Sequence, residues 1–364
     1  MKEGPQRRLN EDRFMKELES CWEILPRVSR SFALAIRLLP KPVSDQTMLA
    51  YLIYRLIDTV EDSHAKLGVK RKLFSSLLLV LARKRVMAEE IGRTKAFMLS
   101  QIDCTYEREL IERLPEVAAA FYAQPAPVRA VTLRWGREMA RGMLYFQKKP
   151  IRTFADQSKY AYYVAGVVGY LFNDLLYLNK IISSRLHRQL RSRAKRFGLA
   201  LQKVNILRDV AQDVPAKRYY WPIRVMEHYE LDYQTLLVRE NRQKAMAVLR
   251  EEIDDATEYL QAGIQYVTAL PKDQLGVRLF CIIPLFMAIE SYLACVNNAD
   301  VFDQSKTVKI TREQVGEIIL RSNLWGGEDT RLMQWYRSRM KAVRVGPAAA
   351  EAKPVPAIAR AGNR

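Results

Sequence analysis

Two acidic segments with helical spacing constrain the fold of this chain more than any other feature. The segments Tyr54–Asp62 and Asn205–Asp213 each end on an aspartate and carry another aspartate four residues earlier. Residues four apart lie on the same face of a helix. Apolar side chains surround both segments and indicate that the two helices lie in a core: Leu52, Ile53, Leu56 and Ile57 around the first, and Val204, Ile206, Leu207 and Val210 around the second.

Carboxylates on a buried helix must face water, cations or a metal, because an unpaired buried charge is too costly. Hard oxygen ligands suit magnesium, which binds a few carboxylates together with waters and substrate phosphates. Arg55 and Arg208 stand beside the two segments as natural partners of a diphosphate. The alternative is a pair of exposed helices with ordinary charge pairs. We predict two facing acidic walls that hold a diphosphate through Mg²⁺, with the metal ligands Asp58, Glu61, Asp62, Asp209 and Asp213.

The composition predicts an all-α fold. Of the 364 residues, 49% are hydrophobic and only 15 are glycine, and the long stretches are rich in good helix formers. Alternating strand patterns bounded by turn signals are absent. We expect a loose polar segment over residues 1–18, one domain over residues 19–340, and a disordered basic tail over residues 341–364.

Periodicity and prolines set the expected helix limits. Pro215 cannot continue the helix that carries the second acidic segment, so Val214–Pro222 should be a loop or flap. The apolar stretch Leu279–Val296 contains Pro284 and Glu290 and is interpreted as a buried helix rather than a membrane span. Helices are predicted over Phe14–Leu39, Val43–Ser63, Tyr160–Leu178, Leu190–Val214, Gln234–Thr268, Gln274–Asn297 and Arg312–Ser322.

The cysteines and the N-terminal residues argue for a reducing compartment. The four cysteines and three histidines are scattered, without the spacing of a zinc site or a disulfide framework. Charge rather than an apolar run follows the first methionine, so no secretory signal is expected. We therefore expect a cytoplasmic protein without a spanning anchor.

The formal net charge of +19 has three interpretations: a solvated surface, a nucleic-acid partner, or an anionic membrane. No nucleic-acid-binding motif is present, and the acidic segments would repel a polyanion. We expect no nucleic-acid partner and predict peripheral attachment to the anionic inner face of the membrane through the basic surface and tail. A monomer is expected.

The order and spacing of eight short segments across roughly residues 20–325 resemble the squalene synthases. These belong to the squalene/phytoene synthase family of head-to-head prenyl synthases. The segments are Ser29–Phe32, Asp58–Asp62, Tyr163–Gly169, Leu201–Asp213, Tyr220–Pro222, Phe280–Ile289, Asn297–Phe302 and Val308–Ile310. The second acidic segment departs from the family pattern at Gln212, where squalene synthases often carry an acid.

The resemblance implies a helical isoprenoid synthase bundle around a central cavity. It implies the joining of two farnesyl diphosphates through presqualene diphosphate to squalene, with NADPH as reductant. The alternatives are a presqualene diphosphate, dehydrosqualene or phytoene synthase, or an inactive helical scaffold. Aromatic faces stabilise carbocations without attacking them, and the matching positions are Phe32, Tyr51, Tyr163 and Phe280. Tyr163 is also the predicted relay for the proton lost when the cyclopropane closes.

The remaining predicted contacts concern the substrate and the nicotinamide. Gln202 and Asn205 lie seven and four residues before Asp209, so they can share its helix face. The predicted substrate-binding residues are Arg55, Arg208, Ser31, Gln202 and Asn205. By resemblance, the region around Lys309 and the flap bind NADPH, with Lys217 and Arg218 as candidates for gripping a nucleotide phosphate.

Overall fold

The computed structural model describes residues 5–83 and 87–344, with side chains from residue 14 onward except those of Arg30 and Ser31. Every regular element in these residues is helical, which confirms the all-α prediction. The elements are α1 (Pro5–Val28), α2 (Arg30–Arg37), α3 (Val43–Asp62), α4 (Leu67–Ala82), α5 (Ala88–Leu99), α6 (Thr105–Glu112), α7 (Leu114–Tyr122), α8 (Ala126–Phe146), α9 (Phe154–Ala161), the π-helical turn η1 (Tyr162–Gly166), α10 (Val167–Leu178), α11 (Ser184–Arg208), α12 (Val210–Asp213), α13 (Ile223–His228), η2 (Arg239–Asn241), α14 (Arg242–Ala269), α15 (Leu275–Cys295), η3 (Ala299–Phe302), α16 (Arg312–Trp325) and α17 (Asp329–Arg344).

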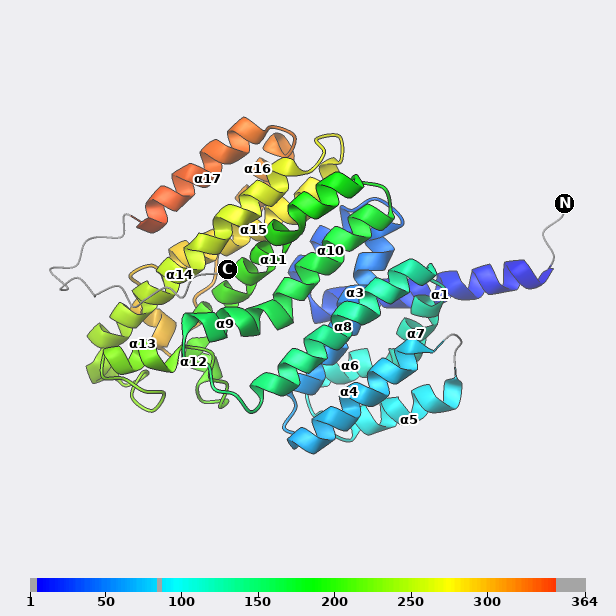
Figure 1. Cartoon of the computed structure of the whole chain (residues 1–364), viewed down its shortest axis with the longest axis horizontal. Helices are drawn as coiled ribbons and strands as arrows, with labels where there is room; N and C mark the ends of the chain where they lie inside the picture. Colours follow the sequence, from blue (N-terminus) through cyan, green and yellow to red (C-terminus); the bar gives the residue numbers. More distant parts are fainter. Residues whose placement is uncertain (1–4, 84–86, 345–364) are drawn as a thin grey trace.

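The helices pack around two hydrophobic cores. One core belongs to the first half of the chain, from α1 to α8, and includes the inner side of α10. The other belongs to α11 and α14–α17. Val164 and Phe280 pack against both cores. Figure 1 shows α8, α10, α11, α14 and α15 running in one general direction across the molecule, so the two cores meet along these long helices.

The helix that carries the first acidic segment matches its prediction, because α3 spans Val43–Asp62. The apolar stretch also forms the predicted buried helix. Among the described residues, α15 is the one helix long and apolar enough to cross a membrane, and 67% of its apolar window is buried inside the protein. It contacts α2, α11, α14, α16 and α17, which is the position of a core helix.

Several predicted boundaries were wrong. The polar start is helical from Pro5, since its long charged side chains are good helix formers. Helix α11 begins at Ser184 because the Ser183 side chain accepts a hydrogen bond from the Leu186 N–H. Helix α14 begins only at Arg242, because the Asp232 side chain holds the preceding segment in a turn.

Helix α17 was not predicted, and it extends to Arg344, past the predicted start of the tail at residue 341. Residues 345–364, the rest of the predicted tail, lie outside the described residues.

Two glycines allow the helices around η1 to approach closely. A Cβ atom at Gly142 of α8 would lie 1.9 Å from the Tyr163 ring, and one at Gly169 of α10 would lie 2.1 Å from the Ala194 carbonyl oxygen of α11. No larger side chain fits at either position without movement of the helices. The close packing holds η1 and α10 between α8 and α11.

Candidate active site

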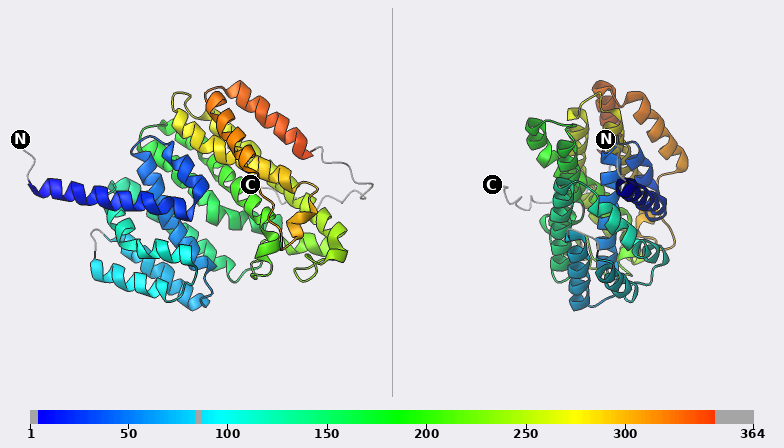
Figure 2. Two further views of the ribbon diagram at one scale, coloured as in Figure 1. Left: turned by 180° about the vertical axis from the view of Figure 1, so that it is seen from behind. Right: turned by 90° about the vertical axis from the view of Figure 1, so that its right-hand side faces the viewer.

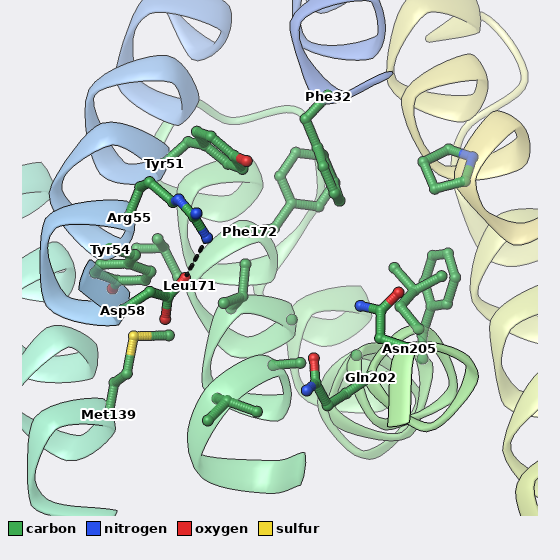
Figure 3. A pocket seen from close by; sticks show the side chains of 18 of the residues that line it. Phe32, Tyr51, Tyr54, Arg55, Asp58, Met139, Leu171, Phe172, Gln202 and Asn205 are labelled. Carbon is green, nitrogen blue, oxygen red and sulfur yellow. Dashed lines mark ion pairs between the residues drawn. The ribbon is translucent and has the colours of Figure 1, made fainter. Parts of the chain in front are cut away.

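A cavity of about 520 Å³ lies between the two cores. Its walls come from α2, α3, α8, α9, η1, α10, α11, α12, α14, α15 and the flap after α12. Figure 3 shows Tyr51, Arg55 and Asp58 projecting from α3, with Phe172 from α10 between them and the α11 side chains. Gln202 and Asn205 project from α11 on the other side. The cavity therefore has one wall from each half of the chain.

The first acidic pair lies on the uninterrupted helix α3. Its two aspartates line the cavity, each with about one-third of its side chain exposed. The Arg55 guanidinium lies 3.9 Å from the Asp58 carboxylate and also 3.4 Å from the Glu107 carboxylate of α6. Glu107 was not predicted, because nothing in its local sequence marks it as a neighbour of α3.

The second acidic pair lies at a helix break. Asp209 ends α11 and precedes α12, although its carbonyl oxygen still accepts a hydrogen bond from the Asp213 N–H at 2.9 Å. Both aspartates still line the cavity, so the break does not separate them from the site. Arg208 donates two hydrogen bonds to the Asp209 carboxylate, from Nε at 2.7 Å and from Nη2 at 2.5 Å.

Arg218 of the flap bridges the two pairs. Its Nε donates to the Asp213 carboxylate at 2.9 Å, and its Nη1 lies 3.7 Å from the Asp62 carboxylate. The two acidic pairs therefore face one another, as predicted, with a guanidinium between them. The sequence analysis predicts Arg218 as a contact of NADPH, whereas its ion pairs place it at the acidic end of the cavity.

Burial shifts the acid–base properties of both pairs. It raises the pKa of Asp58 to about 7, against the opposing effect of the Arg55 guanidinium. It also raises the pKa of Asp213 to about 6, although Arg218 opposes this. The Asp58 side chain lines the cavity, where the surrounding protein desolvates its carboxylate.

Glu61 lies deeper than the aspartates around it and is only 9% exposed. Burial raises the pKa of its carboxyl well above the usual range, and the Asp62 and Asp58 carboxylates raise it further. Its Oε1 accepts a 3.5 Å hydrogen bond from the Tyr160 hydroxyl, and its backbone carbonyl accepts one from the Lys70 ammonium group. Glu61 also lines the cavity beside the two aspartates, and its ligation of a metal stays a prediction.

Tyr160 is one of several cavity tyrosines that are not among the predicted site residues. It lines the cavity, is 4% exposed, and stacks on Tyr220 of the flap with ring centroids 4.8 Å apart. Tyr163, the predicted proton relay, instead packs against Gly142 of α8 and Phe146 and is not among the residues that line the cavity. The π-helical turn η1 accounts for this placement, because it adds a residue to the turn and changes which side chains face inward.

Aromatic rings form the apolar end of the cavity. Phe32 and Tyr51 lie with ring centroids 5.4 Å apart, and Phe280 lies 4.5 Å from Phe172, a residue not predicted. Ser29 caps α2 by accepting a hydrogen bond from the Phe32 N–H and so fixes the start of the helix that carries this ring. The predicted aromatic residues Phe32, Tyr51 and Phe280 therefore do line the cavity.

The predicted substrate contacts are mostly at the cavity surface. Arg55, Arg208, Gln202 and Asn205 all line it. The Ser31 side chain lies outside the described residues.

The predicted nicotinamide region lies beside the second acidic pair. The Gln212 side chain donates a 3.0 Å hydrogen bond to the Lys306 carbonyl oxygen, which joins the region around Lys309 to the end of α12. Lys309 is exposed, and so is Lys217 of the flap, which has a left-handed backbone with a φ of 58°. Val308, by contrast, is buried in the core.

The donor set suits magnesium bound together with a diphosphate. Within residues 5–83 and 87–344, no cluster of three or more acidic, histidine or cysteine side chains forms a ready-made metal cage. Two separate carboxylate pairs at one end of a cavity meet the preference of Mg²⁺ for one or two carboxylates plus waters and phosphate oxygens. The residues therefore fit this ion in the presence of its substrate.

An aromatic cavity inside a helical bundle, with paired carboxylates on facing walls, defines a helical isoprenoid synthase. The sequence matches the squalene/phytoene synthase family over residues 25–314, so the chain belongs to this family.

Individual relatives carry more specific names. The chain is 30% identical to squalene synthase BSS of Botryococcus braunii over 308 residues, or 83% of this chain and 64% of the relative. It is 29% identical to the squalene synthase of Schizosaccharomyces pombe, over 84% of this chain and 65% of the relative. The chain thus spans slightly less than two-thirds of these relatives. The solved complex of TcSQS with the ligand BPH1237 aligns with a TM-score of 0.82 at 28% identity, over 93% of this chain and 94% of that chain.

Proposed function

We propose that this protein joins two molecules of farnesyl diphosphate head to head to form presqualene diphosphate and reduces that product to squalene with NADPH. The observation that carries the proposal is the pairing of two acidic walls, bridged by Arg218, with an apolar cavity lined by aromatic rings. The squalene synthase relatives and the similar TcSQS structure support this product over its unreduced alternatives.

The acidic and basic residues at the acidic end of the cavity would hold the diphosphates. Bound Mg²⁺ supplies the positive charge that neutralises the departing diphosphate. Asp58, Asp62, Asp209 and Asp213 would hold the ion. The guanidinium groups of Arg55, Arg208 and Arg218 would donate to phosphate oxygens, which they match in planar geometry. Arg208 and Arg218 now donate to carboxylates, so substrate binding would exchange these acceptors for phosphate oxygens.

The walls of the cavity would protect the cations that form after the diphosphate leaves. The rings of Phe32, Tyr51, Phe172 and Phe280 lie in the apolar end of the cavity and offer faces that attract positive charge without attacking it. Tyr160 stands between Glu61 and the flap, at the acidic end. We assign to its hydroxyl, in place of that of Tyr163, the relay of the proton lost on ring closure: the phenol oxygen would accept that proton while its O–H passes its own proton to the departing diphosphate.

The nicotinamide would bind beside the second wall. Bound NADPH supplies the hydride for the second half of the reaction. Lys217 and Lys309 are exposed cations on two segments next to this wall, and such groups fit the phosphates of a dinucleotide. Arg218 is left out of this assignment because of its ion pairs with the aspartates.

The test is product analysis with purified protein, farnesyl diphosphate and Mg²⁺, with and without NADPH, using mass spectrometry. We expect squalene only with NADPH, and presqualene diphosphate or hydroxylated relatives without it. Lys309→Ala should shift the products toward the unreduced pattern while the consumption of farnesyl diphosphate continues. Arg312→Ala, an exposed cation at the start of α16, serves as the matched control.

Other outcomes would replace the proposal. Dehydrosqualene or presqualene diphosphate as the final product at every NADPH concentration would assign the chain to those synthases. Turnover of geranylgeranyl diphosphate alone would indicate phytoene synthesis. Absence of turnover with any prenyl diphosphate would indicate an inactive scaffold.

A further inference from the structure

The excess positive charge of this protein is concentrated in one part of the chain. Residues 126–208 contain 17 lysines and arginines against three aspartates and glutamates, a net charge of +14. The rest of the chain contains 42 against 37, a net charge of +5. Less than a quarter of the residues therefore carries most of the total of +19. A merely solvated surface would not require this segregation.

The three acids in this stretch are already occupied. Glu138 pairs with Arg141 at 2.8 Å, and Asp156 pairs with Lys149 at 3.1 Å. Asp174 accepts hydrogen bonds from the Trp135 indole and bonds to the His187 ring. Most lysines and arginines of residues 126–208 therefore have no acidic partner within the same stretch.

The basic stretch folds into one side of the molecule. Helix α10 packs against α8 on one side and α11 on the other. In the right-hand view of Figure 2 these green helices lie along the left edge of the molecule. We call the outer surface of α8, α10 and the first half of α11 the basic face. Its exposed cations include Arg134, Arg137 and Arg141 of α8 and Arg185 and Arg188 of α11.

Aromatic rings are interleaved with the cations, and a cation lies over one face of several of these rings. The Arg191 guanidinium lies 4.2 Å from the centre of the Tyr170 ring, and Arg134 lies 4.7 Å from that of the Trp135 ring. Lys159 covers Tyr145 at 4.9 Å. Binding of single-stranded nucleic acid uses open ring faces on which bases stack. Rings already capped by cations do not offer such a platform.

The same features suit a lipid headgroup layer. Tyr145 and Tyr177 are 41% and 42% exposed, and tyrosines with an apolar ring and a polar tip are enriched at membrane interfaces. Arginines on the same side attract anionic lipids. Helix α10 also carries Leu171, Phe172 and Leu175 on its cavity side, so the basic face lies one helix away from the cavity. The value of that proximity for an oily product rests on the proposed function, whereas the charge argument does not.

We propose that the basic face docks this protein onto a bilayer that contains anionic lipids. Docking requires no spanning segment and no covalent lipid. The basic face would contact the lipid headgroups, and α10 separates this face from the cavity.

Vesicle sedimentation of the full chain tests the proposal without substrate, so its outcome is separate from that of the enzyme assay. Vesicles of phosphatidylcholine alone are compared with vesicles that include phosphatidylglycerol. The face variant is Arg134→Gln, Arg137→Gln and Arg188→Gln together. The control variant, Arg312→Gln, Arg337→Gln and Lys341→Gln, removes the same charge from exposed positions of α16 and α17.

We expect the wild-type protein to bind only the phosphatidylglycerol vesicles and to dissociate at about 1 M salt, where the Debye length is about 3 Å. Each arginine near an anionic surface contributes about a fivefold change in partitioning, so the face variant should bind about a hundredfold more weakly. The control variant should bind nearly as well as the wild type.

Equal losses in the two variants, or no loss in the face variant, would overturn the proposal. So would wild-type protein that ignores anionic vesicles. Tighter binding of a single-stranded oligonucleotide than of vesicles, with the loss again confined to the face variant, would reassign the face to nucleic acid. Thermal melting of each variant verifies that the fold is intact.

Discussion

The acidic pair of α3 and the acidic pair that follows α11 have the same spacing, yet they differ in what neutralises them. Asp58 and Asp62 lie 3.9 and 3.7 Å from their nearest guanidinium groups, at the outer limit of an ion pair. Asp209 and Asp213 each accept a direct hydrogen bond from an arginine, at distances of 2.5–2.9 Å. Arginine therefore compensates the negative charge of the first pair only loosely, whereas it compensates that of the second pair tightly.

This difference indicates that the two pairs have different tasks when substrate arrives. The loosely compensated pair can accept a cation without first breaking a strong ion pair. The tightly compensated pair can accept one only when Arg208 and Arg218 turn to another anion, and a diphosphate provides it. Cation binding at the second pair would therefore be coupled to substrate binding, whereas at the first pair it would be less so.

The largest expected effect comes from removing one carboxylate from each pair. Asp58→Asn and Asp209→Asn should each lower turnover of farnesyl diphosphate by about a thousandfold, since metal-assisted charge stabilisation is worth several kcal/mol. The assay is repeated over a range of Mg²⁺ concentrations, with thermal melting as the folding control. A variant Asp209→Asn with near wild-type turnover would reduce the second pair to an anchor for Arg208.

The second-largest effect on activity is expected at Tyr160, which connects Glu61 of the first acidic segment to Tyr220 of the flap. Tyr160→Phe removes the hydroxyl beside Glu61 and should slow formation of presqualene diphosphate by about a hundredfold, the usual scale for a positioned acid or base. Tyr163→Phe is the matched control, because its ring packs against α8, and it should change the rate by less than about threefold. Reversed effects would restore Tyr163 as the proton relay.

Replacement of Arg218, which bridges the two acidic pairs, should lower activity less than the loss of a carboxylate from either pair. Arg218→Gln removes charged hydrogen bonds worth about 1.5–3 kcal/mol and should lower kcat/KM for farnesyl diphosphate by about 10- to 100-fold. Arg224→Gln, an exposed arginine of α13, should have no comparable effect. If Arg218 instead binds NADPH, the first condensation would be unchanged and only the ratio of squalene to presqualene diphosphate would fall.

The smallest expected effect is on stability and comes from the buried network behind the flap of the second pair. The Gln157 side chain donates to the Glu252 carboxylate at 2.9 and 3.1 Å and to the Tyr220 carbonyl oxygen at 3.2 Å. Burial raises the pKa of Glu252 from 4.5 to about 8, although the Lys203 ammonium group opposes this. The folded protein therefore holds a proton over this window that the unfolded chain has released.

Stability should consequently decrease as the pH rises from about 4.5 through about 8. Glu252→Gln does not titrate, so its melting temperature should fall by a few degrees less than that of the wild type across this range. Thermal unfolding at several pH values measures the two slopes. Glu227→Gln, at an exposed position of α13, should keep the wild-type slope. Parallel slopes in all three proteins would show that Glu252 titrates normally.

Features that depend on neighbouring residues in the chain were largely predictable. Helical periodicity placed α3 and α15 within one or two residues of their predicted limits and indicated that both helices are buried. Spacing of four residues identified both acidic pairs, and Pro215 identified the flap. The aromatic residues Phe32, Tyr51 and Phe280 came from the resemblance to a family, and the structure places all three in the cavity.

Features that depend on packing between distant helices were decided only by the tertiary structure. One π-helical turn directs Tyr160 into the cavity and Tyr163 toward α8, and no local pattern marks that turn. The flap folds back so that Arg218 meets aspartates 5 and 156 residues away in the sequence. The physical reason is the range of the interactions: helix propensity and side-chain spacing act within a few residues, whereas ion pairs and cavities form between surfaces that meet only after folding.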